Sequence, residues 1–304
     1  MEKSYVSIVN QKKSKNVVET VMAAIFMVCA VVSVLAVVSI TVYMFISGTP
    51  ALMKIGIKDI LFSSVWAPTA ANPQFGILNI ILTSIVGVFL AVCIGVPIGV
   101  FTAINLSEIA SPKTRSIIKS AVELLAGIPS VVYGFIGLQI IVPFVRSLFG
   151  GTGFGILSGV CVLFVMILPT VTFMTVDSLK AVPRHYREAS MAMGATRWQT
   201  IWRVVLNAAR PGIFTAVIFG MARAFGEALA IQMVVGNSAV MPTSLTTPAA
   251  TLTSVLTMGI GNTVMGTVQN NVLWSLALVL LLMSLAFNSI VKLITKERKR
   301  NYER

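Results

Sequence analysis

The hydrophobic residues of this 304-residue chain gather into long runs bounded by charges or by residues typical of turns. A helix needs about 20 mostly apolar residues to cross the hydrocarbon core of a membrane, and six runs reach that length. They cover Val17–Ile46, Leu78–Asn105, Lys119–Val145, Ile156–Asp177, Pro211–Val235 and Val272–Ile294. The pattern therefore predicts an all-α integral membrane protein with six transmembrane helices.

Composition supports this class, because 56 % of the residues are hydrophobic and only 11 % are charged. A soluble domain is ordinarily much less apolar. The three cysteines, Cys29, Cys93 and Cys161, lie inside the apolar runs at spacings that indicate neither a metal site nor a disulfide. A cleaved signal peptide is a poor alternative for the first run, which exceeds the roughly 7 to 15 apolar residues of such peptides and has no small-x-small cleavage site.

The distribution of the basic residues gives the expected orientation. The net charge is +13, with nineteen basic residues in the two tails and in the connections after the second and fourth runs, against three in the other connections. Connections that face the cytoplasm carry the excess of Lys and Arg. We therefore expect both termini in the cytoplasm and the uncharged connector 236–271 outside. Nucleic acid is the weaker explanation of the charge, because the bias follows the spans.

Three parts of the chain are expected. Residues 1–76 form a cytoplasmic tail, the first helix and an outer loop (47–76) whose function the sequence does not indicate. Residues 77–294 form a transmembrane domain with a cytoplasmic loop at 178–210, and residues 295–304 form a basic cytoplasmic tail.

The third run contains Gly127-Ile128-Pro129-Ser130, where proline removes a helical hydrogen bond and predicts a kink. Inside a bilayer the freed carbonyl must be satisfied by protein or by water. Either the kink has a purely structural role, or its residues, including Ser130, line a transport pathway.

The stretch Ala181–Pro211 predicts a helix-turn-helix in the loop between the fourth and fifth runs. Pro183 suits the first position of a helix of about ten residues that Gly194 would end. Thr196 and Gln199 have the spacing of a capping box for a second helix, and Pro211 would begin the next span. A DNA-reading unit is the weak alternative, since the membrane spans on both sides prevent it from lying freely along a major groove. A solvated basic loop that only fixes topology is the other alternative.

The same stretch resembles the EAA loop of the ABC importer permeases. Glu188-Ala189-Ser190, three residues, Gly194, nine residues and Val204-Val205-Leu206-Asn207 follow the family pattern, with Ser190, Val204 and Asn207 as departures. The resemblance implies a type I ABC importer permease fold and a coupling helix that docks on a separate ATPase. It assigns that coupling to Arg187, Glu188, Ala189, Ser190, Gly194 and Leu206.

Nucleotide chemistry is expected on a partner. The sequence has no GxxxxGK[ST] phosphate loop, so we expect no cofactor on this chain and place ATP and magnesium on the partner ATPase. The spans also lack a group of His, Asp or Cys suited to metal binding or to nucleophilic catalysis, which argues against an intramembrane enzyme.

Charged residues inside the runs are the candidate pathway residues. Arg223 falls near the centre of the fifth run, and Glu227 four residues later would share its helix face. A charge at such depth costs on the order of 3 kcal/mol, so the two should face the bundle or a wet cavity. They are either a self-neutralising structural pair or a site where Arg223 meets an anionic substrate. Glu123 is a weaker candidate, near the predicted cytoplasmic boundary.

Two segments narrow the resemblance. Leu125–Gly137 and Ala222–Asn237 look like the phosphate-specific ABC permeases, and the part after Glu227 resembles the C-type subunit, with Ala228 and Leu229 as departures. The resemblance implies a bacterial inner-membrane assembly with a second related permease, an ATPase dimer and an extracytoplasmic phosphate-binding protein. It also implies contact with membrane lipid and none with nucleic acid. A permease for sulfate or molybdate, and a self-powered transporter or channel, are the alternatives.

Overall fold

The computed structural model describes the backbone of residues 2–302 and the side chains of residues 17–293. Most of this chain is helical. In order, the elements are α1 (Glu2–Ile55), α2 (Ile57–Phe62), β1 (Trp66–Ala67), β2 (Gln74–Phe75), α3 (Leu78–Ile104), the π-helical segment η1 (Asn105–Ile109), α4 (Pro112–Gly127), α5 (Ser130–Ile136), the π-helical segment η2 (Gly137–Ile141), α6 (Val142–Phe149), α7 (Ile156–Lys180), α8 (Arg184–Ala192), α9 (Arg197–Thr200), the π-helical segment η3 (Ile201–Val205), α10 (Leu206–Gly226), α11 (Leu229–Val234), α12 (Leu252–Ile260) and α13 (Val268–Tyr302).

Six helical stretches are long and apolar enough to cross a membrane, which confirms the predicted class. They are Val17–Ile55, Leu78–Ile109, Ser130–Phe149, Ile156–Lys180, Arg197–Gly226 and Val268–Leu293. The first, second, fourth and sixth begin within a few residues of the predicted runs. The third and fifth differ more, because the chain breaks its helices where the sequence places charges, glycine and proline.

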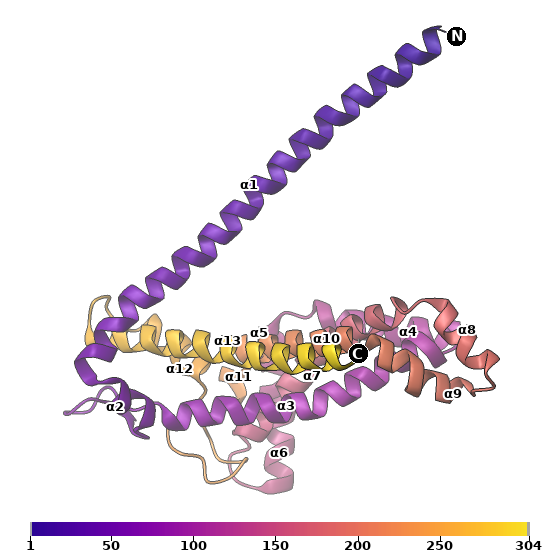
Figure 1. Ribbon diagram of the computed structural model, residues 1–304. Coiled ribbons are helices and arrows are strands. Elements are labelled where there is room, and N and C mark those ends of the chain that lie inside the picture. Colours follow the sequence, from indigo (N-terminus) through magenta and orange to yellow (C-terminus); the bar gives the residue numbers. More distant parts are fainter. Residues whose placement is uncertain (1, 303–304) are drawn as a thin grey trace.

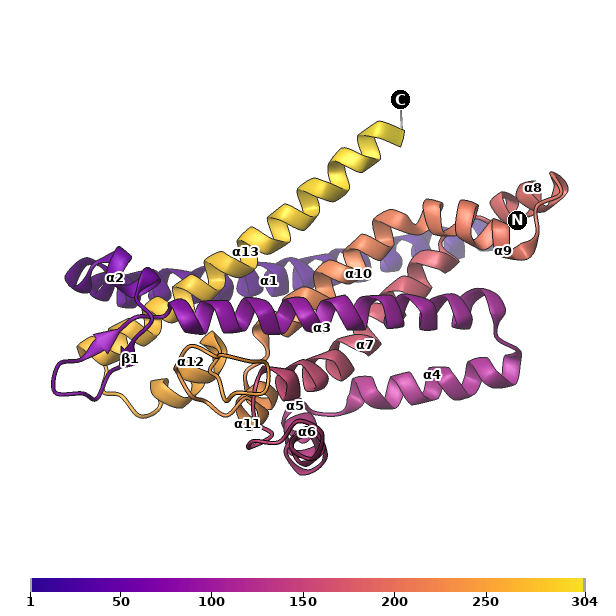
Figure 2. The ribbon, with the colours of Figure 1, turned by 90° about the horizontal axis from the view of Figure 1, so that it is seen from below.

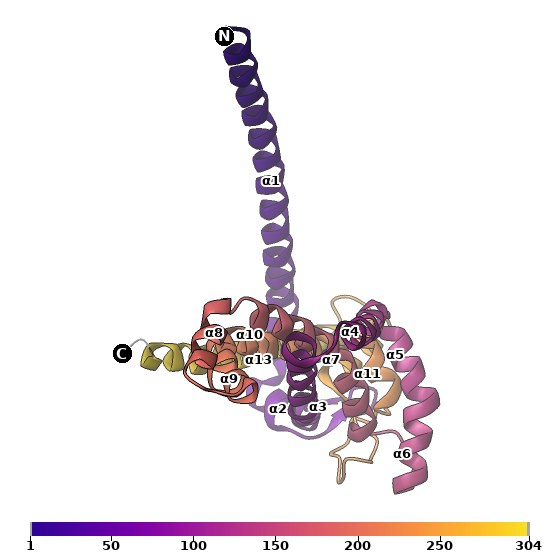
Figure 3. The same cartoon turned by 90° about the vertical axis from the view of Figure 1, so that its right-hand side faces the viewer.

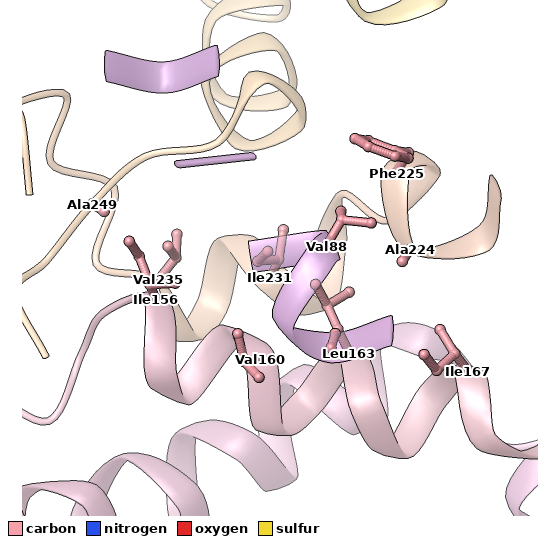
Figure 4. Packing of buried hydrophobic residues seen from close by; sticks show 11 residues of the cluster. Val88, Ile156, Val160, Leu163, Ile167, Ala224, Phe225, Ile231, Val235 and Ala249 are labelled. Atoms are coloured by element: carbon pink, nitrogen blue, oxygen red, sulfur yellow. The ribbon is translucent and has the colours of Figure 1, made fainter. Parts of the chain in front are cut away.

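The core lies where α7 packs between α3 and α10. Glycines allow this close approach: a Cβ on Gly95 would lie 2.7 Å from Ile167, and one on Gly99 would lie 2.9 Å from Val171. Small residues let helix backbones come together where water does not drive association. Figure 4 shows the buried cluster along one face of α7, which includes Ile156, Val160, Leu163 and Ile167.

Helices α3, α4, α7 and α10 run along one another between two ends (Figures 1 and 2). We call one the hairpin end, because it carries the antiparallel pair β1–β2, and the other the α8 end, because it carries α8 and α9. The N-terminal part of α1 and the C-terminal part of α13 both extend from the hairpin end toward the α8 side. Their placement in the cytoplasm stays a prediction.

Helix α1 joins the bundle near the hairpin end. There the Ser275 hydroxyl donates to the Gly48 carbonyl at 2.7 Å, and the rings of Tyr43 and Trp274 meet edge to face at 4.8 Å. From residue 17 to residue 40 every side chain is exposed, and Figure 3 shows α1 leaving the other helices altogether. This long apolar segment therefore contributes almost nothing to the core of its own chain.

The predicted third span Lys119–Val145 is wrong in its bounds. Helix α4 ends at Gly127, Ile128 and Pro129 are extended with ψ of 127° and 143°, and a new helix begins at Ser130. Proline cannot continue the hydrogen-bond ladder and forces the residue before it out of the helical region. The expected kink is thus a full break. The Tyr133 hydroxyl donates to the Leu125 carbonyl at 2.6 Å, which satisfies one carbonyl that the break frees.

The predicted fifth span Pro211–Val235 is also wrong in its bounds. The helix runs from Arg197 through η3 to Gly226 with Pro211 inside it, so Pro211 does not begin the span. The five-residue π-helical turn of η3, a few residues before Pro211, shows that the backbone departs from α geometry here. At the far end Glu227 is extended, and the short α11 follows separately.

Candidate functional site

The loop 178–210 folds as its sequence predicts, with one difference. Helix α8 begins at Arg184, so Pro183 lies at the N-cap rather than at the first helical position. Gly194 has φ of +84°, a conformation that costs glycine nothing and ends the helix. The capping box is confirmed: the Gln199 amide donates to the Thr196 hydroxyl at 3.3 Å, and the Thr196 amide donates to the Gln199 side chain at 2.9 Å.

The EAA-like residues do not all face the same way. Glu188, Ala189 and Gly194 are exposed. Ser190 is half-buried, and its hydroxyl lies 2.9 Å from that of Thr200, which gives the departure from alanine a structural role. Leu206 is half-buried against the apolar cluster beneath the loop.

Arg187 points into the permease. Its guanidinium forms a forked ion pair with Glu108, with Nη2 2.6 Å from Oε1 and Nε 3.2 Å from Oε2. It also donates to the carbonyls of Val182 at 2.8 Å and Leu179 at 3.0 Å. Glu108 lies in η1, at the end of the span that α3 begins. The sequence analysis missed Glu108, although an acidic residue in a connection otherwise rich in Lys and Arg was a usable signal.

Arg223 lies in the last turn of α10, so it is not at the centre of its helix. The Arg223 side chain nevertheless reaches the middle of a neighbouring span. Its Nη1 donates to the hydroxyl of Thr170 at 3.2 Å, and Thr170 is near the middle of α7. Thr170 is 53 positions away along the chain, and nothing in the sequence pointed to it.

Glu227 does not share a helix face with Arg223, because α10 ends one residue earlier. The Glu227 carboxylate instead accepts the Ala230 amide at 2.9 Å at the start of α11. It lines a cavity of about 10 Å³, together with Ser84, Thr251 and Thr253. That volume holds about one water molecule. Within residues 17–293 no ion pair joins Arg223 to Glu227, which sets aside the self-neutralising pair.

Ser130 and Glu123 lie on either side of the first break. Ser130 opens α5, which packs against α11, and a Cβ on Gly134 would lie only 2.8 Å from the Cα of Ala230. The short helices that follow the two breaks therefore pack closely against each other. Glu123 is exposed on α4, outside the six spans, and its carboxylate is 3.4 Å from Lys119. The side chains of Glu123 and Arg223, both in the described part of the chain, do not contact each other.

The family follows from a comparison with known proteins. The model of the binding-protein-dependent transport system inner membrane component matches residues 95–300. The chain belongs to this family. It is thus a multi-pass membrane permease of the ABC importer class, and the predicted fold is confirmed.

Relatives of the permease carry related names. A probable ABC transporter permease protein YqgH of Bacillus subtilis (strain 168) is 45 % identical over 274 residues, which cover 89 % of each chain. The phosphate transport system permease protein PstC of Mesorhizobium japonicum is 34 % identical over 237 residues, which cover 71 % of this chain and 72 % of the relative.

Solved structures share the fold of the permease. In the inward-facing MetNI methionine ABC transporter, a chain with a TM-score of 0.52 and 26 % identity covers 72 % of this chain and 94 % of its own length. A chain of the bacterial alginate ABC transporter has a TM-score of 0.58 at 13 % identity, covering 87 % of this chain and 94 % of its own, and at that identity it shows the fold alone.

Within residues 17–293 of the permease, no three His, Cys, Asp or Glu side chains come together in a way that could hold a metal ion. Arg223 reaches a polar group of another span, and Arg187 reaches Glu108 from the loop. The two candidate sites are therefore a charged centre at mid-depth and a polar loop at the α8 end.

Proposed function

We propose that this permease forms half of the translocation pathway of an ATP-driven importer for inorganic phosphate, and that α8 couples it to a separate ATPase. The observation that carries the proposal is the position of Arg223. A cation at mid-depth between α10 and α7 is costly in a membrane protein and marks an ion or substrate pathway.

The Arg223 guanidinium suits an oxyanion. It has five N–H donors in a planar fork, and the bond to Thr170 uses one of them. Arginine binds phosphate through paired N–H groups, which gives both charge neutralisation and orientation. Ser130, which opens a helix at the neighbouring break, and Glu227, which closes α10, are the further groups that we place along this pathway. Glu123 stays a candidate for the exit of this pathway toward the α8 end.

The exposed face of α8 suits a protein partner. Beside Glu188 and Ala189 it presents the large side chains of Tyr186 and Met191, which are 46 % and 44 % exposed, and Met193 at its C-cap is 88 % exposed. Aromatic and methionine side chains are enriched in the centres of protein interfaces. Glu188 would pair with a polar groove of the ATPase, while the small Ala189 and Gly194 would allow close approach.

The proposed assembly pairs this chain with a second related permease, an ATPase dimer at the α8 end and a phosphate-binding protein at the hairpin end. ATP and magnesium belong to the ATPase. Closure of the ATPase dimer would move α8 and open the pathway alternately to the two sides. The family's description as binding-protein-dependent supports this scheme, as does the PstC relative.

The test replaces Arg223 in the complete transporter. Arg223→Ala should lower ATP-dependent phosphate uptake roughly 100-fold or more, because the substrate loses its charged partner. Arg223→Lys should retain part of the uptake, since lysine keeps the positive charge but lacks the paired N–H donors of the guanidinium. The amount of ATPase that co-purifies should stay unchanged in both. Near-normal uptake by Arg223→Ala would show that Arg223 is not on the pathway.

A second oxyanion, sulfate or molybdate, is the remaining candidate substrate. One arginine attracts each of these anions, so the geometry at Thr170 favours none of them. The phosphate name of the Mesorhizobium relative is what favours phosphate here.

A further inference from the structure

Helix α8 carries the coupling residues, yet none of its nine side chains is buried. Burial of apolar area is the usual means by which a short helix is held in place, because a helix of this length is unstable alone. Something else must therefore fix α8 on the surface of the bundle. The structure shows two polar ties: the contact between Ser190 and Thr200, and the contacts of Arg187.

The Arg187 tie is the more extensive of the two. Its guanidinium reaches across the loop and makes four short donations, two to the Glu108 carboxylate and two to main-chain carbonyls. The side chains are only 21 % and 12 % exposed for Arg187 and Glu108. Removing one partner of a forked, partly desolvated pair of this kind is costly, because the other charge is then left largely buried without its counter-ion.

One of the carbonyl acceptors of Arg187 connects this tie to the membrane-spanning helix α7. Leu179 is fully buried in the last turn of α7, and Glu108 lies in η1 directly after α3. Nine residues before Leu179, the same helix carries Thr170, which holds Arg223. The segment of α7 after Pro169 is thus in contact with the coupling loop at one end and with the charged centre at the other, about 13 Å away along the helix.

We propose that Arg187 and Glu108 form a clamp that fixes α8 to the ends of α3 and α7 before any ATPase binds. Arg187 is then a positioning residue that passes a displacement of α8 to α7 and so to Thr170 and Arg223. It is not a contact of the ATPase, because its donors are already directed into the permease. This role rests on the proposed function of α8 as the docking helix.

The first experiment needs neither ATPase nor substrate. Hydrogen exchange of the α8 amides is measured in the full chain in lipid nanodiscs for Glu108→Gln, which keeps the shape of the side chain, and for Arg187→Lys, which keeps its charge. Both should exchange about tenfold faster than the parent, because each loses the fork. Lys113→Gln, which removes an exposed charge from α4, is the matched control and should leave α8 unchanged. Unchanged α8 exchange in Glu108→Gln would overturn the clamp.

The second experiment uses the assembled transporter and separates positioning from docking. Glu108→Gln and Arg187→Lys should both retain the co-purifying ATPase and lower the amount of substrate moved per ATP hydrolysed several-fold. The double variant should be no worse than the poorer single variant, because both changes remove one interaction. Loss of the ATPase from Arg187→Lys, with Glu108→Gln behaving as the parent, would make Arg187 a docking residue and contradict the proposal. If the transporter proves inactive for phosphate, the exchange result still decides the clamp.

Discussion

At the scale of the residue, the charged groups act through partners that the sequence does not place beside them. The charge of Arg223 inside an apolar run marks it as a candidate pathway residue, but its partner Thr170 lies on another span. Glu227 was assigned to the same helix face by spacing alone, and the end of α10 at Gly226 invalidates that assignment. Spacing rules hold only inside a continuous helix, so a broken helix separates neighbours that the sequence pairs.

Thr170 should position Arg223 for substrate. In Thr170→Val the shape is kept but the acceptor is lost, so uptake should fall about fivefold to tenfold, mainly through a higher KM. Thr170→Ser keeps the hydroxyl and should stay near the parent. Thr175→Val is the matched control on α7, because the Thr175 hydroxyl is buried without a partner among the described residues. Equal uptake in the two valine variants would remove Thr170 from the account.

At the scale of the element, the sequence predicted which segments are helical but not where they stop. The capping box at Thr196 and the stop at Gly194 were readable because cap chemistry is local. The break at Gly226 could not be predicted from the sequence, since it depends on α11 turning to pack against α5. The ion pair between Arg187 and Glu108 was equally hidden, because it joins elements 79 positions apart.

The contact between α5 and α11 can be tested through two glycines on either side of the first break. A Cβ at position 134 would press on the backbone of Ala230, whereas one at Gly127 would meet nothing within 4 Å. Gly134→Ala should therefore cost about 1–3 kcal/mol of stability, and Gly127→Ala should cost less than 1 kcal/mol. Thermal unfolding of the purified chain in detergent gives the comparison. An equal midpoint for both variants would mean that the two breaks do not pack tightly.

At the scale of the whole molecule, the six spans and the helical class could be predicted because hydropathy alone specifies membrane helices. The sequence could not show that α1 stands away from its own bundle, since its residues are as apolar as those of a packed span. The architecture that results has Arg223 near the middle of α7 and the loop 178–210 at one end, and α7 contacts both.

The proposed function makes phosphate transport by this chain depend on a partner ATPase. The most direct measurement is uptake of labelled phosphate by proteoliposomes that contain the complete transporter, with and without ATP and the binding protein, and with unlabelled sulfate or molybdate as competitors. We expect uptake that requires both ATP and the binding protein and that neither competitor reduces. Uptake by the purified chain alone without ATP, or uptake blocked by sulfate or molybdate, would contradict the account.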